Sequence, residues 1–128
     1  MSVDLLAEAM NIIKTNSHVG KSGCTVKYSK LIMQVLEIMK RNGYVEDFRV
    51  VEDGKGGKID VRLSGKINNC GVIKPRASVK RHEWYKIEEQ YLPGVGIGII
   101  IVSGIKGVVT NREAQKMKLG GRLIGFVY

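Results

Sequence analysis

Cysteine and histidine are scarce in this 128-residue chain, which has two of each. Cys24 and Cys70 lie far apart and form no Cys-x-x-Cys pair, and His18 and His82 are isolated from each other and from both cysteines. A zinc site needs such groups at close spacing, and a disulfide framework needs more cysteines. The sequence therefore predicts no metal site, no cofactor bound through one and no disulfide framework, and it fits a reducing compartment.

Long apolar runs are also missing. The longest, Leu92 to Val102, has 11 residues, whereas a helix that crosses a bilayer needs about 20. Asp4 and Glu8 interrupt the first apolar stretch, which a secretory signal does not tolerate. We therefore expect a soluble, cytoplasmic protein.

Proline is rare, with two residues, while glycine is abundant, with sixteen. Average usage is about 7% glycine, so this excess predicts many tight turns and close backbone approaches.

Acidic residues are few in the second half of the chain. Residues 1–60 carry nine basic and eight acidic residues, whereas residues 61–128 carry twelve and four, so nearly all of the net charge of +9 lies in the second half. A concentrated positive field favours a polyanionic partner, because neutralised phosphates release their counterions. A basic protein without a specific partner is the alternative interpretation of charge alone.

Hydrophobic spacing predicts an α+β protein of two small lobes, residues 1–64 and 65–128. The first is an α-β-α-β-β lobe, with a helix over 3–15 capped by Ser2 and a second helix capped by Ser29. Its strands are expected at 25–28, 44–51 and 58–63. The second lobe is expected to be mostly antiparallel β with one short helix after the capping box Thr110-Asn-Arg-Glu113. Its strands are expected around 67–73, over 97–102 and over 122–128.

No arrangement typical of an enzyme is found. The carboxylates cluster at 46–53, beside a hairpin turn, where solvated charges are the better interpretation. Gly94-Val-Gly-Ile-Gly98 precedes a strand instead of following one, so it is no dinucleotide fingerprint. Gly54-Lys-Gly-Gly57 lacks the Gly-Lys-Ser/Thr ending of a phosphate loop. We expect no catalytic residues.

One segment stands out as a candidate binding loop. In Val102-Ser-Gly-Ile-Lys-Gly107 an apolar strand gives way to small residues and Lys106, just before the capped helix. Small residues let a backbone approach a ligand closely, and exposed amides before a helix attract phosphate. Leu119-Gly-Gly-Arg122 offers a second such turn. From spacing alone, two ordinary turns remain the favoured alternative.

Several segments, in order, resemble the archaeal and eukaryotic form of the small-subunit ribosomal protein S8 family. The strongest match is the closing part, and the matching segments cover nearly the whole chain: Tyr28-Ser-Lys-Leu31, Asn42-Gly-Tyr44, Ile67 to Arg76, Tyr91-Leu-Pro93, Gly98 to Ser103, Gly107 to Thr110, Arg112-Glu-Ala114 and Gly120 to Tyr128. The resemblance implies two α/β lobes, no catalysis and a primary binder of ribosomal RNA. It would hold an irregular helix in the central domain of small-subunit RNA and stabilise its fold during assembly.

The resemblance also implies which residues contact RNA. In the family, the loop before the short helix enters the RNA minor groove and the N-terminal helix also meets RNA. By position, and with the neighbouring cations that can reach phosphates, the candidates here are Asn11, Lys14, Thr15, Ser29, Lys30, Lys74, Arg76, Lys80, Arg81, Lys86, Ser103, Gly104, Ile105, Lys106, Gly107, Gly120, Gly121 and Arg122. Ser29 can equally serve as a helix cap alone. Trp84 and Tyr85 can stack on an unpaired base, although a core or lobe-interface role is favoured.

The chain departs from the family after the Leu-Pro pair, where it has Gly94 and Val95 in place of a segment with an Arg, and at two positions of the candidate binding loop. Where the family has Thr and then Ser or Thr after the first Ser, this chain has Gly104 and Ile105. Two hydroxyls are lost, so Ser103, Lys106 and main-chain groups are expected to take a larger share of any contact.

Alternative functions remain open from the residues alone. A free-standing RNA-binding regulator or RNA chaperone, including one that represses its own messenger RNA, shares the basic lobe. A nucleotide-acting enzyme and a protein-interaction module are less favoured. The expected partners are small-subunit RNA and neighbouring ribosomal proteins, with one copy of the chain per ribosome, no membrane and no small-molecule substrate.

Overall fold

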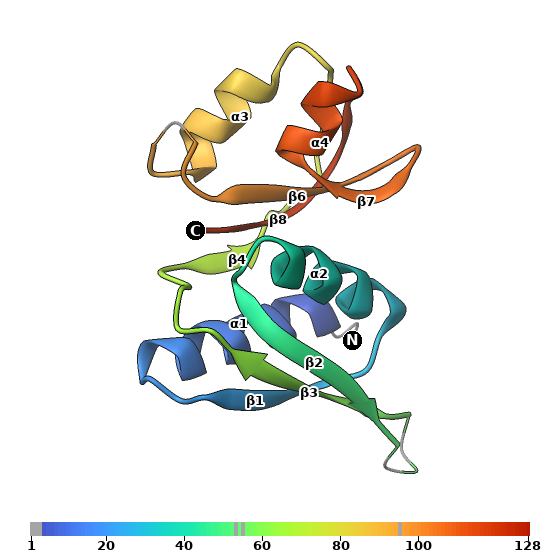
Figure 1. The fold of residues 1–128 in the computed structure, drawn as a ribbon. Helices are drawn as coiled ribbons and strands as arrows, with labels where there is room; N and C mark the ends of the chain where they lie inside the picture. Colours follow the sequence, from blue (N-terminus) through green and yellow to red (C-terminus); the bar gives the residue numbers. More distant parts are fainter. Residues whose placement is uncertain (1–3, 53, 55, 95) are drawn as a thin grey trace. The chain divides into compact units, whose positions relative to one another are not determined.

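The computed structural model describes residues 4–52, 54, 56–94 and 96–128 (Figure 1). The chain divides into two compact units, Met1–Gly71 and Val72–Tyr128, whereas the sequence placed the boundary between residues 64 and 65. Each unit combines helices with antiparallel strands, which confirms the predicted α+β class.

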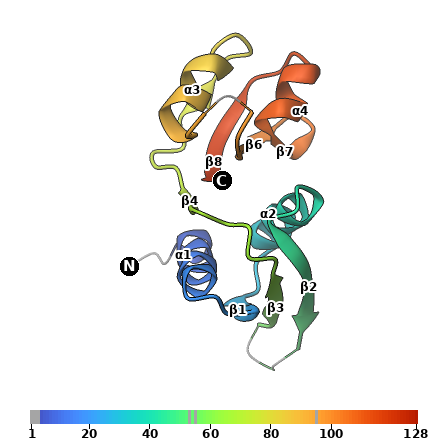
Figure 2. The same ribbon diagram turned by 60° about the vertical axis from the view of Figure 1, so that its left-hand side comes forward.

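The first unit is a three-stranded antiparallel sheet with two helices on one face (Figures 1 and 2). The strands β1 (Gly23–Lys27), β2 (Val45–Val51) and β3 (Lys58–Leu63) pair in the order β1-β3-β2. In β3, Ile59, Val61 and Leu63 are buried while Lys58 and Arg62 are exposed. This period of two is the pattern of a sheet covered on one side.

The helices of this unit are α1 (Leu5–His18) and α2 (Lys30–Arg41). The predicted cap of the first helix is wrong, because the Asp4 carboxylate accepts the amide hydrogen of Ala7 at 3.0 Å and Ser2 lies outside the described residues. Ser29 occupies the predicted cap position of α2, but its side chain makes no capping hydrogen bond. Gly43, with φ +82°, ends the α2 segment in the left-handed conformation that the sequence predicted.

The strands of the second unit form a five-stranded sheet whose edge strand β4 spans the boundary between the units. Its β5–β8, β6–β7 and β6–β8 pairs are antiparallel. Four strands follow the order β4-β8-β6-β7, and β5 also pairs with β8. The strands are β4 (Cys70–Val72), β5 (Ser78–Val79), β6 (Ile99–Gly104), β7 (Gly107–Thr110) and β8 (Gly121–Val127). The predicted start of β6 at residue 97 is wrong, since Ile97 lies outside the strand and is exposed.

Two helices, α3 (Trp84–Tyr91) and α4 (Asn111–Lys116), pack on one face of this sheet (Figures 1 and 2). The prediction of a single short helix in this part of the chain is therefore wrong, because it missed α3. Trp84, Ile87 and Tyr91 recur at helical spacing and pack on the core, but the charged residues between them hid the pattern.

Trp84 is a core residue, as the sequence favoured, whereas the same expectation is wrong for Tyr85, which is 74% exposed. Trp84 is 3% exposed, it packs with Ile100, Val102 and Leu123 of the sheet, and its Nε1 donates a hydrogen bond to the carbonyl oxygen of Leu119 at 3.0 Å. The predicted cap of α4 by Thr110 is confirmed, because Thr110 Oγ1 accepts the amide hydrogen of Glu113 at 3.2 Å. The packing of Trp84 thus holds α3 on the sheet, and the Ile100 amide of β6 donates to Asn111 Oδ1 of α4 at 3.1 Å.

The described residues contain no helix suited to crossing a membrane and no cluster of metal ligands. Across residues 4–52, 54, 56–94 and 96–128, no helix has the length and hydropathy that would let it cross a membrane. In the same part of the chain, no three His, Cys, Asp or Glu residues come together as metal ligands would.

Candidate nucleic-acid interface

The segment that the sequence singled out forms the tip of a β-hairpin. Ser103 and Gly104 end β6, Ile105 and Lys106 make a two-residue turn, and Gly107 begins β7 opposite Gly104. Gly107 has φ +95°. Glycine adopts this angle without strain because it has no Cβ, and the tight turn depends on it. Ile105 is 88% exposed and Lys106 is also exposed, so the tip presents an apolar and a cationic side chain to solvent.

This geometry corrects one expectation. The sequence placed the loop directly before the capped helix, so that helix amides would join it in binding phosphate. Instead, β7 separates the turn from α4, which begins only at Asn111. The amides at the start of α4 therefore belong to a different part of the unit.

A row of polar residues crosses three strands beside this tip. Ser103 of β6 pairs with Arg122 of β8, and Arg122 pairs with Ser78 of β5. Directly opposite residues of antiparallel strands place their side chains on the same face. We call Ser78, Arg122 and Ser103 the polar row; all three are exposed.

The polar row lies on the sheet face away from the helices. The neighbours of its members along each strand, Val79, Leu123 and Val102, belong to the core cluster that includes Trp84 of α3 and Ala114 of α4. Because successive side chains of a strand point to opposite faces, Ser78, Arg122 and Ser103 face the other way. The row and the hairpin tip together offer two hydroxyls, one guanidinium and one ammonium group.

Backbone packing within the protein explains why glycine occupies the positions beside the polar row. A Cβ on Gly120 would lie 2.2 Å from the carbonyl oxygen of Val79, and one on Gly121 would lie 3.1 Å from that of Ser103. One on Gly104 would lie 3.3 Å from the carbonyl oxygen of Gly120. The close backbone approach that the sequence indicated is therefore made between strands of the same sheet.

The predicted cations fall into two groups. Arg76 and Lys80 are exposed and lie within two residues of Ser78, with Lys74 exposed earlier in the same connection. Lys86 lies on α3, and Arg81 lies just before it, so the fold places Lys86 on the helical side of the sheet, away from the polar row. The structure brings together only some of the cations that the sequence grouped.

The candidates near the N-terminus belong to the first unit. Asn11 and Thr15 are exposed one turn apart on α1, and Lys14 is half-buried beside them. Ser29 is half-buried and Lys30 exposed at the start of α2. They are therefore a separate group of polar side chains on the two helices of this unit.

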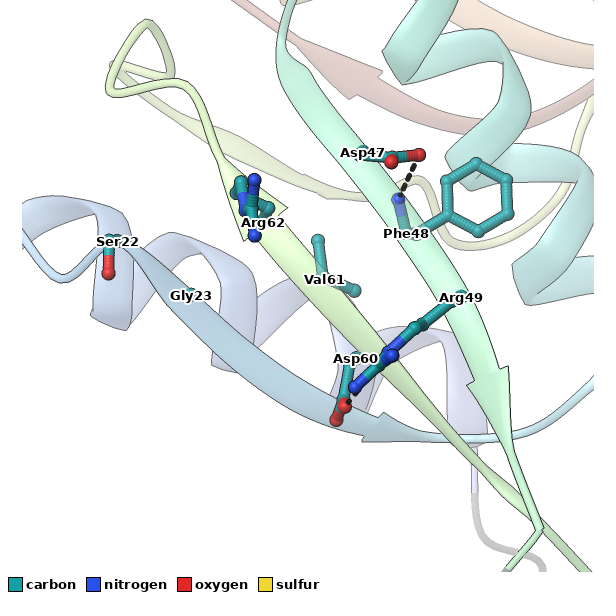
Figure 3. Close-up of a pocket in the computed structure, with 8 residues that line it drawn as sticks. All are labelled: Ser22, Gly23, Asp47, Phe48, Arg49, Asp60, Val61 and Arg62. Carbon is teal, nitrogen blue, oxygen red and sulfur yellow. Dashed lines mark hydrogen bonds and ion pairs between the residues drawn. The ribbon is translucent and has the colours of Figure 1, made fainter.

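A hollow of about 470 Å³ on the outer face of the first sheet is a poor site for an anion (Figure 3). Arg49 Nε lies 3.7 Å from Asp60 Oδ2, and Arg62 Nη1 lies 3.9 Å from Glu46 Oε1. The Phe48 amide and Lys40 hold the pKa of the Asp47 carboxyl below its usual range. The acidic groups thus offset the arginines that line this hollow.

Both cysteines are free, and their environments suppress thiol reactivity. Burial raises the pKa of Cys70 to about 11, and its Sγ donates to the carbonyl oxygen of Met10 at 3.5 Å. Burial also raises the pKa of the half-buried Cys24 thiol. A nucleophilic cysteine needs the opposite shift, so neither thiol is suited to covalent chemistry.

Sequence reasoning missed Ser78 as a member of the polar row. It lies in β5, which is two residues long and carries no recognisable hydrophobic alternation. Only its pairing with Arg122 assigns it to this face.

Comparison with known proteins gives consistent matches along the chain. The profile of the family described as ribosomal protein S8 matches residues 4–128. The chain is 47% identical over 127 residues to the small ribosomal subunit protein uS8 of Methanococcoides burtonii, covering 98% of both chains. It is 48% identical over 129 residues to the small ribosomal subunit protein uS8 of Archaeoglobus fulgidus, covering all of both chains.

Proposed function

Because this chain belongs to the ribosomal protein S8 family, we propose that it binds a helix of small-subunit ribosomal RNA through the polar row and the β6–β7 hairpin tip. As a member of that family it is a structural protein of the small subunit of the cytoplasmic ribosome, and it is not an enzyme. Our proposal concerns the residues that contact RNA and the role of the protein in assembly.

The observation that carries the proposal is the pairing of Ser103 with Arg122, next to the exposed turn Ile105-Lys106. A-form RNA has a major groove too deep and narrow for side chains and a shallow minor groove lined by 2′-hydroxyls. A short hydroxyl such as that of Ser103 can exchange hydrogen bonds with those 2′-hydroxyls. The longer Arg122 and Lys106 then reach the flanking phosphates.

The hairpin tip suits close entry into such a groove. Gly104 and Gly107 carry no side chains, so the two strands form a thin edge around Ile105 and Lys106. Ile105 stands where the family has a hydroxyl residue, and at 88% exposure it is free to pack on a ribose or a base edge. Main-chain groups of Gly104 and Gly107 take the place of the missing hydroxyls.

Cations outside the row supply affinity more than selectivity. Lys74, Arg76 and Lys80 flank Ser78 along the chain and are placed to neutralise phosphates. We assign Gly120 and Gly121 a supporting role, since they let the strands of the row approach each other. Asn11, Lys14, Thr15, Ser29 and Lys30 would contact a second stretch of the RNA from the helices of the first unit.

In this proposal the protein holds its RNA helix in the folded form during assembly of the small subunit. It acts as one copy, with neighbouring ribosomal proteins around it. Binding that stabilises only the folded RNA shifts the RNA equilibrium toward that form by mass action.

Two measurements test the proposal together. Filter binding should show tight, saturable binding of the full chain to central-domain RNA of the small subunit and much weaker binding to an equally long large-subunit RNA. Sedimentation of a cell extract should place the protein with small subunits at one copy each. Equal binding to both RNAs, or sedimentation free of small subunits, would contradict it and favour a free-standing RNA-binding regulator.

A further inference from the structure

A second hollow lies within the second unit, on the helical side of its sheet. It has a volume of about 570 Å³ and is lined by Arg81, His82, Trp84, Tyr85, Gln115 and Lys118, from the start of α3 and the end of α4. Trp84 and the other core residues hold both helices against the sheet face opposite to the polar row. The hollow is therefore separate from the interface proposed above.

Tyr85 is the most unusual member of this hollow. It is 74% exposed, although large aromatic side chains normally bury most of their surface. Its neighbour Trp84 is 3% exposed and is tied to Leu119 by a hydrogen bond at 3.0 Å, so the backbone that carries Tyr85 is fixed. The Tyr85 ring is thus exposed to solvent on a helix whose backbone is anchored by Trp84.

The charged side chains that line the hollow are of one sign. Among the six lining residues, Arg81, His82 and Lys118 are basic and none is acidic. Two nearby carboxylates are engaged by the protein: Glu83 accepts the amide hydrogen of Lys80 at 2.8 Å, and Glu88 accepts a hydrogen bond from the Gln115 amide. The hollow therefore combines an open aromatic face with cations that no lining acid offsets.

Lys118 occupies a strained position at the end of α4. With φ +56° it is the one non-glycine residue with positive φ that the structure records among residues 4–52, 54, 56–94 and 96–128. Its amide donates to the carbonyl oxygen of Gln115 at 3.1 Å, and the Leu119 amide donates to that of Ala114 at 2.9 Å. Glycine is the favoured residue at such a helix end, so the lysine keeps a cation at the hollow at a cost in stability.

From this arrangement we propose that the hollow binds one unpaired nucleotide of single-stranded RNA, with the base stacked on Tyr85 and its phosphate held by Arg81 and Lys118. The proposal rests on the proposed function, which places the protein on RNA. It adds a second, sequence-tolerant contact on the other face of the sheet. Aromatic stacking flanked by cations is the general way in which proteins hold single strands.

An acidic peptide is the competing occupant. Cations alone would serve a peptide carboxylate, but they leave the exposed Tyr85 ring without a role. A nucleotide uses both, because every base has a flat face and every nucleotide a phosphate. The observations therefore favour RNA.

The test uses the full chain and a fluorescently labelled single-stranded pentamer of adenosine, with anisotropy measured at low salt. We expect binding by the natural protein, a loss of affinity of about fivefold or more in Tyr85→Ala, and retention in Tyr85→Phe, which keeps the ring. Gln90→Ala, exposed on the same helix, is the matched control and should bind as the natural protein does.

Lys118→Gly separates binding from folding. Because glycine tolerates positive φ, this variant should melt at a higher temperature than the natural protein while binding the pentamer more weakly. A merely destabilised variant cannot give that combination. Equal pentamer affinity in Tyr85→Ala and Tyr85→Phe, or displacement of the pentamer by an equal concentration of hexa-aspartate, would overturn the assignment.

Failure of this inference is distinguishable from failure of the proposed function. Binding of the natural protein to central-domain RNA is measured in parallel, by the filter assay described above. If that RNA binds and the pentamer does not, the hollow is no nucleotide site while the proposed function stands. If neither binds, both fail.

Discussion

Ser103 of β6 lies directly opposite Arg122 of β8, because a β-bulge shifts the register of the two strands. Ile101 pairs with Gly125 but Val102 pairs with Leu123, so Ile124 is the extra residue. Without the bulge, Ser103 would face Leu123. Bulges near functional sites commonly redirect side chains in this way, and here the bulge brings a guanidinium beside a hydroxyl.

The Ser103 hydroxyl is the first group to test. We predict that Ser103→Ala weakens binding to the central-domain RNA helix by roughly 1–3 kcal/mol, because the variant leaves a polar group of the RNA without its partner. Filter binding at constant salt measures this change. Ser22→Ala, which removes an exposed hydroxyl from the first unit, is the matched control. An affinity within error of the natural protein would remove Ser103 from the interface.

Lys106 at the hairpin tip should act through charge. Lys106→Ala is expected to weaken binding to matched and mismatched RNA alike, and to reduce the slope of log affinity against log salt by about 1. Arg49→Ala changes the net charge equally but removes an arginine that is paired with Asp60, so its slope should equal that of the natural protein. A loss confined to one RNA sequence would show base recognition by Lys106 and contradict the assignment.

Arg76 is expected to behave like Lys106. It is exposed in the connection that leads to Ser78, so Arg76→Ala should weaken binding uniformly and flatten the salt dependence by a similar amount. Titration at four or more salt concentrations measures the slope. An unchanged slope would place Arg76 outside the interface.

Gly120 is needed by the fold. Gly120→Ala would place a Cβ 2.2 Å from the carbonyl oxygen of Val79, so β5 and β8 would have to move apart. We expect a loss of unfolding free energy of about 1–3 kcal/mol in urea denaturation. In Gly104→Ala the nearest atom is 3.3 Å away, so the loss should be smaller. Equal losses in the two variants would contradict this account of the close approach.

Cys70 gives a prediction for alkaline pH. Its folded pKa of about 11 exceeds the ordinary value of 9.0, so the folded state binds the thiol proton more tightly than the unfolded state does. The resulting stability is complete below pH 9 and is lost as the pH rises toward 11. Between pH 8 and 11 the natural protein should therefore lose roughly 2 kcal/mol more unfolding free energy than Cys70→Ala. The two proteins' pH slopes are compared, since the alanine changes packing at every pH; equal slopes would contradict the prediction.

Much of the fold follows from local patterns. The alternation of Ile59, Val61 and Leu63 indicates a strand covered on one side, and Thr110 with Glu113 marks the start of α4. These signals are readable because they depend on residues close together in the chain. The caps are less secure, since Asp4 and Ser2 are equally good residues for the start of α1.

The parts that the sequence did not predict depend on contacts between distant segments. The buried face of α3 is only Trp84, Ile87 and Tyr91 among charged residues, and it becomes a helix by packing on the sheet. The polar row needs a two-residue strand and a bulge, neither of which has a sequence pattern. The sequence thus indicated the hairpin segment, but the partners of Ser103 required the structure.

The most direct measurement places a photoreactive benzophenone amino acid at position 105, in the exposed turn between β6 and β7. Position 25, on an exposed part of β1 in the first unit, carries the same group as control. After irradiation of assembled small subunits, the label at 105 should crosslink to central-domain RNA with high yield, and the label at 25 should not crosslink to that helix. Crosslinks from 105 to protein alone, or to no component, would contradict the proposal that this hairpin enters the RNA.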